Sequence, residues 1–194
     1  MMLAAAILCG CAATKPVHYY TIQPLSQPAP SSASPASKDG LTLLVGEIVT
    51  PARLQDGRIR YRIGANETGA YEYHRWVDQP GFMVRNSRIR VLRASGRYRR
   101  VLDAGSSAAG DYLVRGKLNE FDEVDNASVQ TKISLQIELV DRKTNLNVWD
   151  GIVEREEPVA SKTVADVVQS LDRNLQGVVS ESATQIGNFL ATQH

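Results

Sequence analysis

Cysteine is almost absent from this chain. Its 194 residues include only Cys9 and Cys11, both at the extreme N-terminus. The rest of the chain can form no disulfide of its own and no cysteine-based zinc site. Its stability must therefore come from a packed hydrophobic core.

Long apolar runs and an excess of charge are also missing. No stretch approaches the roughly 20 consecutive apolar residues that a membrane-spanning helix needs, so we expect no transmembrane span. The 22 basic and 21 acidic residues nearly balance, which gives no support to nucleic-acid binding. The chain has no glycine-rich phosphate loop of Walker or Rossmann type, so any ATP hydrolysis would belong to a partner.

The N-terminus carries a lipidation pattern. Residues 3–8 are apolar and lead into Leu8-Cys9-Gly10-Cys11, which resembles a bacterial lipobox. We interpret residues 1–10 as a signal peptide and expect Cys11 to carry a thioether-linked diacylglycerol and an N-acyl chain such as palmitate, with no other cofactor. The alternatives are an ordinary cleaved signal peptide or a truncated buried helix. They stay open because the first basic residue is Lys15 and the apolar stretch is short for a signal.

Residues 11–39 are predicted to form a lipidated N-terminus and a disordered linker. Pro, Ser, Ala and Gln dominate residues 24–38, which offer too little apolar surface to repay an ordered backbone. At about 3 Å per residue the linker could hold the domain tens of Å from the membrane. The segment from His18 to Ile22 differs because it is apolar and aromatic; it either adds an edge strand or docks on a partner.

Residues 40–194 predict one α/β domain with a mixed, largely antiparallel sheet. Alternation of period two indicates a half-buried strand over 58–63, and it is strongest where Ile133, Leu135, Ile137 and Leu139 share one face. A turn at 141–145, with Asn145 in a left-handed conformation, leads into an antiparallel return strand. The predicted strands cover 41–49, 58–63, 70–76 (or a structured loop), 112–119, 129–140 and 146–155.

Two main helices are predicted to pack on this sheet. From Val164 to Leu190 apolar residues recur at steps of three and four, which favours a helix that covers the sheet over a coiled-coil partner. A second helix is predicted over residues 80–95, with Asp78 as its N-cap. Arg85 and Arg88 intrude on its apolar side. That side is predicted to contain Phe82, Ile89 and Leu92.

One segment combines residue types that are favoured in binding hot spots. We predict it as a partner-contact patch, although an aromatic loop held by its own packing is the alternative. Its residues are Tyr71, Tyr73, His74, Arg75 and Trp76. His74 is also the only histidine placed for acid–base chemistry, since His18 lies in the predicted tether and His194 at the C-terminal end. No catalytic triad surrounds it, so we expect no enzymatic activity.

Two charge clusters have an ordinary and a functional interpretation. Seven arginines between Arg85 and Arg100 could bind anionic lipid head groups or an acidic partner, or they could form a solvated helix face. Asp122, Glu123 and Asp125 lack the spacing of a calcium loop, so we predict a solvated hairpin turn.

The chain resembles the ABC-type transport auxiliary lipoproteins in seven segments that keep their order and spacing. They are the lipobox, Tyr19–Ile22, Arg58–Arg62, Tyr71–Trp76, Leu92–Val101, Asp111–Gly116 and the hairpin of Asp141 and Trp149. The family includes the lipoprotein of the paraquat-inducible Pqi intermembrane transport system. The resemblance implies a domain similar to the N-terminal domain of TolB. It also implies partners: an ABC permease and ATPase and a protein with a mammalian-cell-entry (MCE) domain.

The resemblance implies a periplasm-facing lipoprotein that assists the movement of lipids or hydrophobic solutes across the envelope. Two modes remain open: a docking subunit, which could form a homo-oligomer, or a carrier that binds an apolar ligand itself. A carrier would need an apolar cavity of several hundred Å³. Ala12, rather than aspartate, follows Cys11, and by the family's sorting rule this points to the outer membrane.

Overall fold

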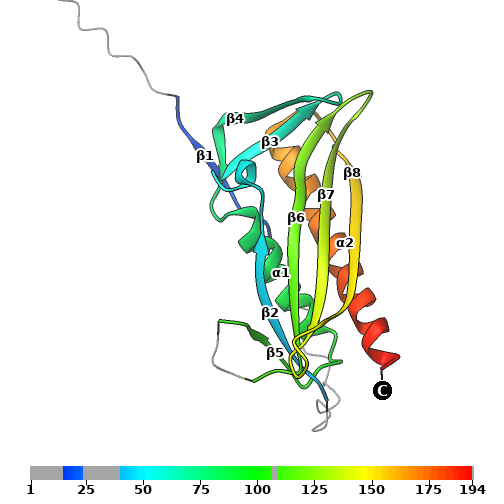
Figure 1. Ribbon diagram of the computed structural model, residues 1–194. Coiled ribbons are helices and arrows are strands. Elements are labelled where there is room, and N and C mark those ends of the chain that lie inside the picture. Colours follow the sequence, from blue (N-terminus) through cyan, green and yellow to red (C-terminus); the bar gives the residue numbers. More distant parts are fainter. Residues whose placement is uncertain (1–14, 24–39, 106–108, 194) are drawn as a thin grey trace, which may run out of the picture.

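A long mixed sheet with two helices on one face makes up most of the chain (Figure 1). The computed structural model describes residues 15–23, 40–105 and 109–193. The strands are β1 (His18–Tyr20), β2 (Thr42–Val49), β3 (Arg58–Ile63), β4 (Glu67–Trp76), β5 (Arg100–Asp103), β6 (Tyr112–Asp125), β7 (Val129–Asp141) and β8 (Asn147–Pro158). The helices are a short 3-10 turn η1 (Ala52–Leu54), α1 (Pro80–Ala94) and α2 (Val164–Ala191). None of these described helices is long and apolar enough to span a membrane.

The antiparallel ladders β6–β7 and β7–β8 form the long part of the sheet. The other edge of β6 is shared by two parallel neighbours: β2 pairs with its first half and β3 with its last four residues. Beyond β2 lies β5, and beyond β3 lie β4 and then β1. The predicted mixed α/β sheet with two main helices is confirmed, and four of its seven strand pairings are parallel.

The C-terminal helix α2 packs its apolar face on β7 and β8, as predicted. The Thr163 side chain caps its N-terminus by accepting a hydrogen bond from the Asp166 N–H at 3.2 Å. Ile133, Leu135, Ile137 and Leu139 of β7 are fully buried, as period two requires. Asn145 has a φ of 58°, which confirms the left-handed turn between β7 and β8.

The first helix, α1, differs from its prediction in cap and orientation. Gln79, not Asp78, is the N-cap, because Pro80 fixes the first helical position and holds the residue before it in an extended conformation. Phe82 is exposed, whereas Met83 and Val84 are buried with Ile89 and Leu92. The helix therefore lies rotated about its axis relative to the predicted apolar side.

The basic run is solvated only in part. Four of its seven arginines are exposed, and the other three, Arg85, Arg88 and Arg90, are partly or fully buried. Arg88 is fully buried between α1 and the sheet, where Gly116 leaves room for it: a Cβ at Gly116 would lie 2.9 Å from an Arg88 Nη atom. Arg85 forms an ion pair with Asp103, and the Arg93 Nε donates to the Val101 carbonyl at 3.0 Å. Much of the arginine run therefore ties α1 to β5 and β6.

The folded unit begins before the Pro/Ser-rich segment. β1 pairs in parallel with β4, with His18 opposite His74, and Ile22 is buried in the core. The alternative that His18–Ile22 adds an edge strand is confirmed. The prediction of a single tether from residue 11 to residue 39 is therefore wrong, because residues 18–22 belong to the domain. The predicted signal and residues 11–14 and 24–39 of the predicted linker lie outside the described residues.

Candidate functional site

The predicted contact patch on β4 is divided between the core and the surface. Trp76 is only 4% exposed, and its ring packs edge-on against Phe121 with the centroids 5.7 Å apart. The backbone N–H of Trp76 donates to the Gly57 carbonyl at 2.7 Å. Trp76 therefore belongs to the core, and its predicted place in the partner-contact patch is wrong. The partner-binding role of Tyr71, Tyr73, His74 and Arg75 stays a prediction.

His74 joins the first strand to the rest of the sheet. Its Nδ1 lies 2.8 Å from the Tyr20 hydroxyl, and its ring stacks on that of His18 with the centroids 5.2 Å apart. Partial burial, followed by the nearby His18, lowers the pKa of His74. These contacts place His74 in a structural joint between β1 and β4.

The acidic cluster is not a solvated turn. Asp122 and Glu123 are consecutive residues of β6, so their side chains lie on opposite faces of the sheet, and both are buried. Asp122 accepts from the Arg53 Nη2 at 3.1 Å, and Glu123 accepts from the Tyr71 hydroxyl at 2.6 Å. Desolvation raises the pKa of both carboxyl groups. Because the side chains of Asp122 and Glu123 lie on opposite faces of the sheet, these two residues cannot bind one cation together. Asp122 pairs with Arg53 and Glu123 with Tyr71.

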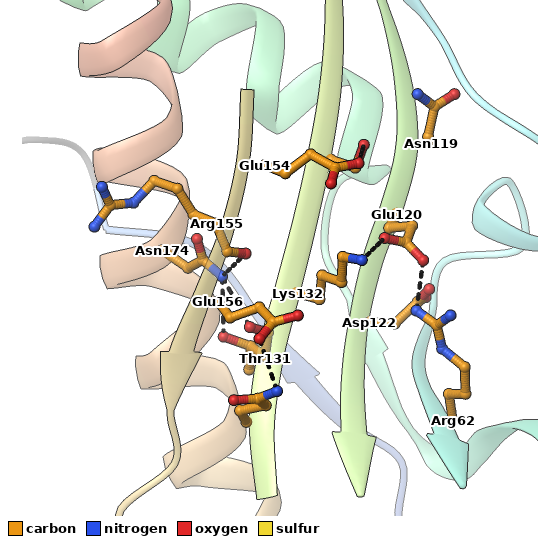
Figure 2. Close-up of polar contacts among 12 residues, drawn as sticks. Arg62, Asn119, Glu120, Asp122, Thr131, Lys132, Glu154, Arg155, Glu156 and Asn174 are labelled. Carbon is orange, nitrogen blue, oxygen red and sulfur yellow. Dashed lines mark hydrogen bonds and ion pairs between the residues drawn. The ribbon is translucent and has the colours of Figure 1, made fainter. Parts of the chain in front are cut away.

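The face of β6, β7 and β8 opposite the helices carries an organised charge network (Figure 2). Glu120 accepts from the Arg62 Nη2 at 2.5 Å and pairs with the Lys132 Nζ at 3.1 Å. Burial alone would raise the pKa of Glu120, but the hydrogen bonds from the two cations outweigh it and the pKa is lowered. Glu120 is thus held ionised between strands β3 and β7.

This open sheet face also has apolar residues and shallow hollows. Ile152 of β8 is 58% exposed, and Val148 lies on the same side of its strand. A hollow of about 410 Å³ beside the charge network is lined in part by Arg62, Lys132 and Glu156. Mixed charge, exposed aliphatic groups and modest relief are what a protein-binding surface offers.

The Arg62–Glu120–Lys132 network was not predicted from the sequence. The alternation of β3 did place Arg62 on the polar side, which was the available signal. The partner could not be read from it, because β3 and β6 are far apart in sequence and pair in parallel. The predicted lipidation site, Cys11, lies outside the described residues.

A second type of hollow lies at the other end of the molecule. It has a volume of about 630 Å³ and is formed by the end of α2 and the segments before β2 and β5. Leu41, Tyr98 and Leu190 supply apolar walls, and Arg97 supplies a positive charge. Its volume falls in the range of small-molecule sites.

Comparison with known proteins gives a consistent result. The family model described as "ABC-type transport auxiliary lipoprotein component" matches residues 20–183. A crystal structure of a DUF330-family protein from Xanthomonas campestris has 20% sequence identity and a TM-score of 0.78, and the match covers 92% of this chain and 100% of that one. An uncharacterized protein of known structure has 13% identity and a TM-score of 0.70, with 89% and 99% covered. No curated protein matches the chain.

Proposed function

This chain belongs to the ABC-type transport auxiliary lipoprotein components, and from that membership we propose that it is an accessory subunit that docks on a transport assembly. Its task is positioning, not catalysis. Residue Cys11 anchors it to a membrane, and the domain presents its open sheet face to a partner. Family membership carries the proposal, and the uncovered sheet face supplies the surface that it needs.

The open sheet face is prepared for docking by its own contacts. Arg62 and Lys132 are both held by Glu120, so little side-chain entropy remains to be lost when a partner binds. Alternating acidic and aliphatic side chains on β8, such as Glu154 and Ile152, add polar and apolar contacts. A partner with basic residues flanking an apolar strip would complement this surface.

The finer parts of the proposal are the partner and the cargo. We propose an MCE-domain protein together with an ABC permease and ATPase, and lipids or other hydrophobic solutes as cargo. We further propose the outer membrane as the site of anchoring, because Ala12 follows Cys11. These parts derive from the family resemblance.

A second function is favoured by the 630 Å³ hollow near Arg97. There an apolar ligand with an anionic head group could bind directly, which would make the protein a carrier. The core under the sheet gives this alternative no further space, since the apolar row of β7 is fully buried against α2.

The test is affinity capture from gently solubilised envelopes with the tagged full chain, followed by identification of both proteins and lipids. We expect an MCE-domain or ABC component to co-purify. Ile152→Asp should abolish its capture, because it places a charge among the exposed apolar side chains of β8. Leu146→Asp is the matched control, since Leu146 is equally exposed but lies in the hairpin turn beyond the face.

Three results would contradict parts of this proposal. Capture that survives Ile152→Asp would show that the open face is not the docking surface. Lipid bound in a one-to-one ratio to protein without any partner would favour the carrier. The anchor is tested separately: Cys11→Ser should move the protein from the membrane to the soluble fraction, and retention in the membrane would refute acylation at this residue.

A further inference from the structure

Exposed apolar side chains gather where the chain enters the domain. Of the nine large hydrophobic residues exposed in the described ranges, four lie here and are between 41% and 65% exposed. We call these four, with Lys15 and Arg75, the N-terminal patch. The four are Val17, Tyr19, Val77 and Phe82.

These residues come from the chain before and along β1, the end of β4 and the first turn of α1, which lie side by side. Tyr19 lies beside Arg75 in the β1–β4 register, and the Val77 N–H donates to the Tyr20 carbonyl at 2.8 Å. Thr21, the residue after β1, lines the same shallow hollow as Phe82 of α1. Because side chains alternate along β1, Val17 and Tyr19 point away from His18 and Tyr20, which pack on His74.

The patch lies very close to the proposed anchor. The Lys15 Nζ lies over the Tyr73 ring, 5.5 Å from its centroid. Cys11 is only four residues before Lys15, so even a fully extended chain cannot separate the two by more than about 15 Å. An acyl chain on Cys11 therefore holds this surface, and not the opposite end of the sheet, against the bilayer.

The composition of the patch suits a lipid interface. Tyrosine and phenylalanine with aliphatic neighbours favour the boundary between head groups and acyl chains. The charged residues in and around the patch are Lys15, Arg75 and Arg90 on one side of the balance and Glu72 and Asp78 on the other, an excess of one positive charge. A lysine or arginine near an anionic surface contributes about 1 kcal/mol, less with salt, so the apolar side chains supply most of the attraction.

We propose that the N-terminal patch is a membrane-contact surface that lies on anionic lipid head groups beside the acylated Cys11. The patch orients the domain on the bilayer, so that the long β6–β8 sheet extends away from it. This rests on the proposed anchor, since the anchor brings the patch to the membrane. It goes beyond that anchor because it assigns a second, non-covalent contact to named side chains.

The test uses the chain from residue 11 onward with Cys11→Ser, which keeps every described residue and lacks the acyl chains. Its binding to vesicles of phosphatidylethanolamine and phosphatidylglycerol is measured by co-sedimentation, with phosphatidylcholine vesicles alongside. We expect weak binding that favours the anionic vesicles. Tyr19→Ser with Phe82→Ser should weaken it by roughly tenfold or more, because losing about 1.4 kcal/mol changes a dissociation constant tenfold.

The matched control is Val148→Ser with Ile152→Ser, which removes two comparably exposed apolar side chains from β8. It should leave vesicle binding unchanged, and both double variants should keep the parent's urea midpoint. No vesicle binding by the parent, or equal loss in both double variants, would overturn the patch while the anchor stands. Capture of an envelope protein that is lost with Tyr19→Ser and Phe82→Ser, while vesicle binding persists, would overturn it in favour of a protein interface.

Discussion

Arg88 carries a positive charge into the interior, and no carboxylate in the described part of the chain forms an ion pair with it. The side chain is fully buried, and its Nη1 donates a hydrogen bond to the Arg115 carbonyl at 3.2 Å. Its Nε and Nη2 have no partner among the described residues. A buried, incompletely bonded cation costs free energy that an apolar side chain of similar length would not. We therefore predict that Arg88→Met stabilises the protein.

The size of the effect follows from the pKa. Burial lowers the pKa of Arg88 from its ordinary value to about 10, and since each pKa unit corresponds to 1.36 kcal/mol, the charge costs roughly 3 kcal/mol in the folded state. Losing the hydrogen bond to Arg115 takes back about 1 kcal/mol. Methionine adapts to irregular space beside Gly116. The net expectation is a gain of about 2 kcal/mol in the free energy of unfolding.

The assay is urea unfolding at neutral pH, followed by the fluorescence of Trp76 and Trp149. With a denaturant slope of about 2 kcal/mol per molar, the midpoint should rise by about 1 M. Arg142→Met is the control, since Arg142 is exposed in the β7–β8 turn, and it should change stability by less than about 0.5 kcal/mol. A loss of more than about 1 kcal/mol in Arg88→Met would refute the reasoning, because it would show that the guanidinium stabilises the fold.

Two further predictions concern Trp76 and Glu123. Trp76→Ala should lower the free energy of unfolding by about 3–5 kcal/mol, because it empties a core position against Phe121; a small loss measured by urea unfolding would mean that the ring is dispensable to the core. Glu123 has a raised pKa, so its contribution to stability should fall as pH rises from about 4.5 through that raised pKa, where the folded state keeps a proton that the unfolded state has lost. Asp122, whose pKa is also raised, contributes in the same direction. Glu123→Gln should therefore make the difference in unfolding free energy between acidic and neutral pH more favourable to neutral pH than in the wild type; an unchanged difference would count against a raised pKa of Glu123.

The strongest local patterns predicted structure well. β7 and α2 each have a long, uninterrupted apolar period, and because one buried face determines such an element, local sequence was enough. The left-handed conformation of Asn145 was equally predictable, because few residue types tolerate that conformation in a short turn.

What the sequence could not show depends on contacts between distant segments. Arg88 reads as a surface residue until Gly116 of β6 is known to lie opposite it. Asp122 and Glu123 read as a turn because two consecutive acids rarely sit inside a strand, and their partners Arg53 and Tyr71 come from other elements. The candidate site shows the same limit. Trp76 is a residue type favoured in contact surfaces, and only its packing against Phe121 of β6 shows that it is buried.

The position of β1 implies an order of events for the export and acylation proposed above. A chain exported in this way leaves the cytoplasm with its N-terminus first, yet β1 has no place to dock until β4 follows, since Tyr20 and His74 are 54 residues apart. Non-local pairings of this kind form late, after the loop between them has closed. The enzymes that acylate Cys11 would therefore meet an unpaired strand with free access to the thiol. Closure of β1 onto β4 would come second and draw the domain down to a membrane to which it is already attached.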